Sequence, residues 1–153
     1  MYYGRALITT ERQSLVTEVT DLDNTMKLKW PHSNFAKSIK PHVELELTLA
    51  DSAKMNGDTT AHFHHLENAH VLGQESTYWH VKVHALMLVW AVQNRKHKEG
   101  FGQLFRIVGA ATKTAIGLIP SGNTGGSNVN PFRTMPITPK HESIIRTAKG
   151  SGK

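Results

Sequence analysis

The chain has 153 residues, a net charge of +6 and no cysteine, and 39% of its residues are hydrophobic. The length favours one domain, and the missing cysteines exclude disulfides, zinc–thiolate sites, Cys-ligated iron–sulfur clusters and cysteine nucleophiles. The basic residues are scattered, so the composition does not favour a nucleic-acid partner. There is no membrane-length apolar run and no recognisable signal peptide, so we expect a cytoplasmic protein that does not bind membranes.

Residues 1–40 are polar and weakly patterned, and we expect them to form a partly ordered N-terminal extension. A short amphipathic helix is predicted within them by the spacing of Leu15, Val16, Val19 and Leu22. The segment "KWPHSN" (29–34) should end any helix, because proline disfavours helical geometry in the residue before it.

A helical core is predicted from residue 41 to residue 118. The first helix should begin at Pro41 and end near Asn56-Gly57, and the second should be capped by Asp58 or Thr59 and run to about Gly73. The third starts at Ser76 or Thr77 and extends to about Lys96, and the fourth spans roughly Glu99 to Ile116. This fourth helix has one apolar stripe, formed by Phe101, Leu104, Phe105, Val108, Ala111 and Ala115.

Short connections make neighbouring helices antiparallel. We therefore predict an all-α fold, a compact antiparallel bundle of about four helices in two αα-hairpins, and leave open a tetratricopeptide-like arrangement. Residues 119–153 are expected to form an irregular wrapping segment and a basic tail. Within them, "SGNTGGSN" (121–128) is typical of glycine turns with positive φ, and the alternative is a loop that covers a site between the helices, closed by Asn128 and Arg133.

Three successive helices each place a pair of metal-competent side chains among apolar neighbours. Within each pair the spacing is three or four residues, which puts both side chains on one helix face. Buried ionisable groups need compensation, and a divalent cation held by imidazole and carboxylate groups supplies it. The candidate ligands are His42 with Glu46, Glu67 with His70, and His80 with His84.

The alternative for any single pair is an ordinary hydrogen-bonded core histidine. Glu-x-x-His resembles the ligand motif of di-iron bundles, but the fourth helix has no carboxylate on its apolar stripe. One metal ion, or an asymmetric pair, therefore fits better than a four-carboxylate site. Iron, copper and zinc all remain open, and the affinity should fall below about pH 6, because imidazole must be neutral to bind a metal.

Four stretches together resemble the small bacterial family called domain of unknown function 3703: "HLENAHVLGQ", "HVKVHALML", "GQLFRIVGAA" and "PSGNTGGSNVNPFRTMPI". The resemblance covers roughly residues 60–137. It implies a compact helical protein in which Glu67, His70, His80 and His84 belong together with the segment from Gly122 to Pro136. The resemblance supplies no activity, and His42 and Glu46 lie outside it.

Three functions compete on these grounds. The first is a metal-binding protein that senses, stores or sequesters a transition metal, and the second is a metal-dependent oxidoreductase or hydrolase. The third is a metal-free helical interaction module, which the expected outward positions of Tyr78 and Trp79 would favour. A homodimer is also left open, because Trp79 and Trp90 could face a second subunit. The metal-binding role is the preferred hypothesis.

Overall fold

The computed structural model describes residues 21, 25, 33–113 and 120–151, so the helix predicted around residues 15–22 lies outside the described residues. The described part is all-helical, as predicted. It contains five helices and no strand: α2 (Asn34–Met55), α3 (Thr59–Gly73), α4 (Thr77–Gln93), α5 (His97–Lys113) and α6 (Pro139–Gly150).

Polar caps fix where these helices begin. The Asp58 carboxylate accepts hydrogen bonds from the backbone N–H groups of Thr60 and Ala61, and Ser76 caps α4 in the same way, as the sequence predicts. The start of the first helix differs from the prediction. It is capped by Ser33 and begins at Asn34, and Pro41 lies inside it. Proline costs that helix one backbone hydrogen bond, and the long buried face of α2 offsets this cost.

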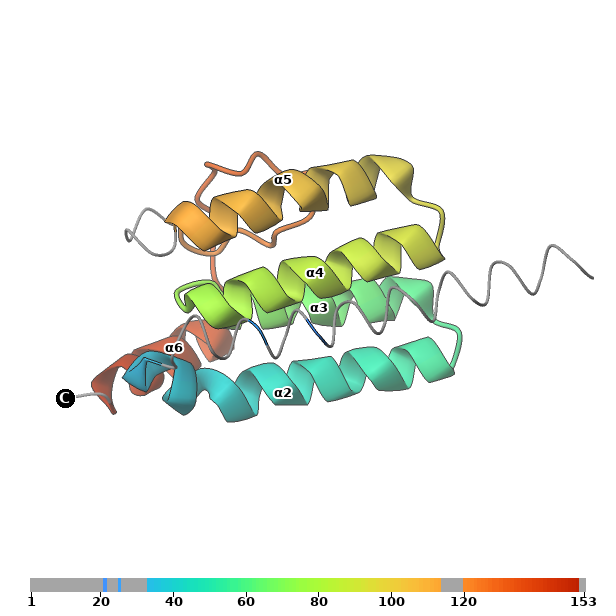
Figure 1. The fold of residues 1–153 in the computed structure, drawn as a ribbon. Helices are drawn as coiled ribbons and strands as arrows, with labels where there is room; N and C mark the ends of the chain where they lie inside the picture. Colours follow the sequence, from blue (N-terminus) through green and yellow to red (C-terminus); the bar gives the residue numbers. More distant parts are fainter. Residues whose placement is uncertain (1–20, 22–24, 26–32, 114–119, 152–153) are drawn as a thin grey trace, which may run out of the picture.

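The helices α2 to α5 run alternately up and down, as Figure 1 shows, because the connections between them are short. Helix α2 packs along α3, and α4 packs along α5, while α3 also contacts α4. Two antiparallel pairs are thus joined through α3 and α4, and the side chains between these two helices lie in the middle of the molecule.

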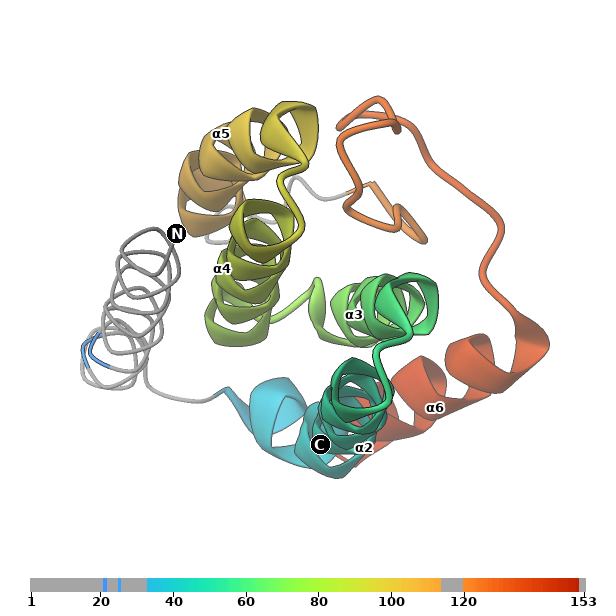
Figure 2. The ribbon, with the colours of Figure 1, turned by 90° about the vertical axis from the view of Figure 1, so that its right-hand side faces the viewer.

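The C-terminal region is only partly irregular, which corrects the expectation for residues 119–153. The chain from 120 to 138 has no helix or strand, but residues 139–150 form α6, with Thr138 as its N-cap. Helix α6 packs against α2 and α3 (Figure 2). The buried side chains of α6 include Ile145 and Ala148, so the predicted basic tail has an apolar face that holds it to the bundle.

Two tryptophans of α4 anchor the core. The indole N–H of Trp79 donates to the carbonyl oxygen of Ala36 at 3.0 Å, and that of Trp90 donates to the carbonyl oxygen of Thr59 at 3.1 Å. Tyr78 and Trp79 are only 3% and 2% exposed. The expectation that they point outward, on which the interaction-module hypothesis rested, is therefore wrong.

Helix α5 is rotated away from the orientation that its apolar stripe predicts. Four residues of that stripe are exposed: Phe101, Leu104, Phe105 and Val108. Ala111 of the stripe packs against the core, and Ala115 lies outside the described residues. The side turned toward α4 instead carries Gln103, which is fully buried, and Ala110. A polar residue therefore faces the interior here. None of the described helices is both long and apolar enough to cross a membrane.

Candidate functional site

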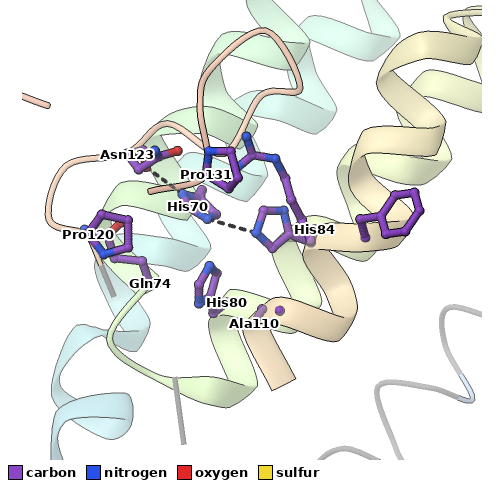
Figure 3. Close-up of a pocket in the computed structure, with 11 residues that line it drawn as sticks. His70, Gln74, His80, His84, Ala110, Pro120, Asn123 and Pro131 are labelled. Carbon is purple, nitrogen blue, oxygen red and sulfur yellow. Dashed lines mark hydrogen bonds between the residues drawn. The ribbon is translucent and has the colours of Figure 1, made fainter. Parts of the chain in front are cut away.

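Three buried histidines meet between α3, α4 and α5. His70 comes from α3, and His80 and His84 lie one turn apart on α4. One ring nitrogen from each lies within 4.8 Å of the others, and the three residues are 2%, 9% and 2% exposed. The ring centroids are 4.6–4.9 Å apart (Figure 3). We call these three residues the histidine cluster.

The irregular segment fixes the proton position on His70. Its Nδ1 lies 2.9 Å from the backbone carbonyl oxygen of Asn123. A carbonyl oxygen only accepts hydrogen bonds, so Nδ1 must carry the hydrogen. In the neutral ring, Nε2 then has a free lone pair, and it points toward His84.

Helix α5 fixes His84 in the same way. Its Nδ1 lies 2.6 Å from Oε1 of Gln103, and Nε2 of Gln103 donates to a carboxylate oxygen of Glu99 at 2.6 Å and to the carbonyl oxygen of Gly125 at 2.8 Å. Both of these partners are acceptors, so the amide of Gln103 has only one satisfactory orientation. Its oxygen must face His84, and Nδ1 of His84 must be the donor.

Two lone pairs consequently face each other. Nε2 of His70 lies 3.1 Å from Nε2 of His84, but neither neutral ring has a hydrogen left to place between them. A cation that both nitrogens coordinate would turn this repulsion into attraction. Two imidazole nitrogens bound to one tetrahedral zinc ion are about 3.3 Å apart, given Zn–N bonds of about 2.0–2.1 Å. The geometry of the pair therefore fits a shared metal ion.

Burial keeps the cluster neutral. It lowers the pKa of His70 and of His84 well below the ordinary value of 6.5, and the neighbouring imidazoles lower it further. Burial also lowers the pKa of His80 to about 4, with a contribution from the positive charge of Arg106. Neutral imidazole is the form that binds metals, so the rings are ready to coordinate at neutral pH.

The glycine–asparagine loop, residues 121–128, holds the cluster from the outside. Arg106 of α5 donates to the carbonyl oxygens of Gly126 and Val129, and Glu99 accepts from the N–H and hydroxyl of Ser127. Gly122 and Gly125 have positive φ, as the sequence predicts. The loop touches the cluster through Asn123 and Gly125. The expected closing residues, Asn128 and Arg133, are exposed.

The structure brings together three of the six predicted ligands and separates the other three. Glu67 lies beneath the loop, where a Cβ on Gly126 would come within 3.2 Å of its carboxylate, and burial raises its pKa. Glu46 is buried beside His65, whose Nδ1 is 2.8 Å from the carboxylate. His42 is half-buried on α2. None of these three belongs to the histidine cluster.

Sequence reasoning missed the residues that support the cluster, namely Glu99, Gln103 and Asn123. The predicted inner face of the fourth helix was its apolar stripe, but four large residues of that stripe are exposed. The sequence does contain one indication that Glu99 and Gln103 act together. They are four residues apart and so share a helix face. The backbone carbonyl of Asn123 left no such signal, since any residue supplies one.

A methyl group at Gly125 should disrupt the site. A Cβ there would lie 2.8 Å from the ring of His70, and the backbone has a φ of +83°, which alanine tolerates poorly. We expect Gly125→Ala to lower the free energy of unfolding by about 1–3 kcal/mol in urea denaturation. Gly109→Ala is the control. Gly109 lies in helix α5, and a Cβ there would have no neighbour within 4 Å, so the substitution should be neutral or stabilising. Equal effects of the two changes would contradict the close packing of Gly125 on His70.

The metal-free protein should lose stability as the pH falls from about 6.5 toward 4. Unfolded histidine takes up a proton near 6.5, whereas His80 in the folded protein does so only at about 4, so acid favours the unfolded chain in this window. His80 alone accounts for about 3 kcal/mol, and the lowered pKa values of His70 and His84 act in the same direction. Urea unfolding across this pH range measures the slope, which should be smaller by about one proton in His80→Asn. An unchanged slope in that variant would show that His80 is already protonated in the fold.

Comparison with known proteins gives one match. The model of a family described as a protein of unknown function, DUF3703, matches residues 37–145, more than two thirds of the chain. No curated protein and no solved structure matches. The matched region contains the histidine cluster, the supporting residues of α5 and the whole glycine–asparagine loop. The resemblance seen in the sequence is thereby confirmed, and the chain belongs to the DUF3703 family.

Proposed function

We propose that this protein binds one transition-metal ion through His70, His80 and His84. The single observation that carries the proposal is the 3.1 Å approach of two Nε2 atoms whose rings both place their hydrogen on the opposite nitrogen. A third imidazole within 4.8 Å completes a three-nitrogen donor set. The binding role, whether sensing, storing or sequestering, is preferred because it requires only this donor set.

The donor set narrows the choice of metal. It holds three neutral nitrogens and no carboxylate or thiolate. Imidazole suits zinc, copper, nickel and iron, whereas non-haem iron sites usually add a carboxylate to two histidines. Zinc and copper are therefore the preferred ions, and three histidines on zinc leave one coordination position for a ligand from outside the protein.

The metal-free alternative would satisfy the cluster with a proton. A proton shared between the two Nε2 atoms would also relieve the repulsion of the lone pairs. That arrangement requires an imidazolium ion in a site where burial and the nearby Arg106 both disfavour positive charge. A metal ion gains three coordination bonds in compensation, whereas a proton gains one hydrogen bond.

The direct test measures metal content and affinity in protein prepared without a histidine tag. We expect the wild type to bind one zinc or copper ion per chain. The affinity should be at least about 100-fold lower in His70→Ala, His80→Ala and His84→Ala than in the wild type. His97→Ala, on the exposed start of α5, is the matched control and should bind as the wild type does. In the metal-free protein, nitrogen-15 NMR should show His70 and His84 protonated at Nδ1. Weak metal binding that all four variants share would refute the site.

Gln103 should act as a positioning residue for His84. Replacing it with leucine preserves the approximate volume but removes the acceptor that holds Nδ1–H, so the ring can rotate or change its tautomer. We expect Gln103→Leu to weaken zinc binding by about 10–100-fold, with the NMR signals of His84 showing a mixture of tautomers. Gln93→Leu, at the far end of α4, provides the control. If Gln103→Leu left both affinity and tautomer unchanged, α5 would have no part in the metal site.

A further inference from the structure

A cavity of about 150 Å³, partly open at the surface, adjoins the histidine cluster. All three histidines line it, and the other lining residues come from α5 and from the first part and the middle of the irregular segment: Phe105, Arg106, Ala110, Pro120, Asn123 and Pro131 (Figure 3). This volume exceeds what one water needs and approaches that of engineered cavities that hold a small ring compound. A metal ion on the three nitrogens would therefore have space on its open side.

One residue of this cavity wall has a buried polar atom that lacks a partner. Gln74, at the end of α3, is 1% exposed, and its Oε1 has no hydrogen-bond partner among the described residues. Gln74 is one of the residues that line the cavity. A buried acceptor left unpaired is costly, so the arrangement is favourable only when the cavity holds a group that donates a hydrogen bond.

The charges around the cavity favour an anion. A divalent ion on three neutral imidazoles keeps its full charge, and the guanidinium of Arg106 lines the same cavity. Two carboxylates lie nearby, Glu99 behind Gln103 and Glu67 beneath the loop. They do not fully balance these three positive charges, and burial strengthens the imbalance because the local dielectric constant is low.

We infer that the cavity holds a small anion that bears one hydrogen-bond donor, coordinates the metal ion at its open position and donates to Oε1 of Gln74. The inference rests on the proposed function, since the metal ion supplies the fourth position. Hydroxide is the smallest such anion. It forms when metal-bound water loses one proton to solvent, and zinc lowers the pKa of that water to about 7–9. The site then resembles catalytic metal sites, in which three protein ligands leave one position open, rather than closed structural ones.

The test uses protein loaded with Co²⁺, whose visible absorption reports the ligands around the ion. We expect the spectrum to change with pH in a single one-proton step, and to change again when nitrate or bicarbonate is added. Both anions should bind less tightly above the midpoint of that step, by about tenfold per pH unit, because hydroxide competes for the same position. Titrations in the His97→Ala control should be identical.

Gln74→Leu tests the donor requirement. Nitrate and bicarbonate have the same charge and nearly the same planar shape, but only bicarbonate has an O–H group to donate. We expect the variant to keep its Co²⁺ affinity within about threefold, to bind nitrate as tightly as the wild type, and to lose about 2–10-fold in bicarbonate affinity. Without metal, the free energy of unfolding of Gln74→Leu should be at least that of the wild type, because the variant lacks an unpaired buried acceptor. If the leucine variant folds poorly, Gln74→Met takes its place in the same measurements.

The outcomes separate the two proposals. Failure of the wild type to bind Co²⁺ would overturn the metal-binding function and this inference with it. Stoichiometric Co²⁺ binding with a spectrum insensitive to pH and to both anions would leave the function standing and overturn the open position. Equal losses of nitrate and bicarbonate affinity in Gln74→Leu would remove Gln74 from the ligand site.

Discussion

The arrangement of the middle of this protein depends on two imidazole nitrogens that face each other with no hydrogen to share. His70 and His84 each direct Nδ1–H away from the other, one to the backbone of the loop and one to a glutamine of α5. The hydrogen bonds to the loop and to α5 thus orient the two rings so that the lone pairs on their Nε2 atoms point toward each other. Proteins rarely keep buried polar groups in such an arrangement without a third partner, and in the proposed function that partner is a metal ion.

The supporting structure explains the unusual orientation of α5. A helix in a small bundle ordinarily buries its apolar stripe, yet four large side chains of this stripe are exposed and Gln103 is buried. Turning the other way would remove the acceptor from His84 and the carboxylate of Glu99 from the loop. The contacts of Glu99, Gln103 and Arg106 with the loop hold α5 in this orientation, and the apolar surface left exposed is the cost of that arrangement.

The glycine–asparagine loop belongs to the same network of contacts that orients the histidine cluster. Gly125 packs against the ring of His70 and accepts a hydrogen bond from Gln103, so one residue without a side chain touches two members of the network. The side-chain amide of Asn123 donates to the carbonyl oxygens of Asn130 and Arg133, which keeps its own carbonyl aimed at His70. This explains physically why a long irregular segment stays ordered: its backbone polar groups have partners within the loop and on two helices.

The sequence by itself determined the local features of this protein. Periodicity placed the helices α3, α4 and α5, the caps Asp58 and Ser76 marked two of their starts, and the spacing of His80 and His84 put them on one face. These features depend on residues a few positions apart, so they can be derived from helix geometry alone.

The tertiary structure decided which of the candidate ligands meet and which neighbours orient them. Glu46 and Glu67 fitted the same helical spacing as the histidines, but packing directs Glu46 toward His65 and Glu67 toward the loop. The rotation of α5 and the return of the chain past residue 120 bring Gln103 and Asn123 to the rings, across 19 and 53 residues of sequence. Contacts over such separations depend on how whole helices pack, and side-chain periodicity within one helix carries no information about them.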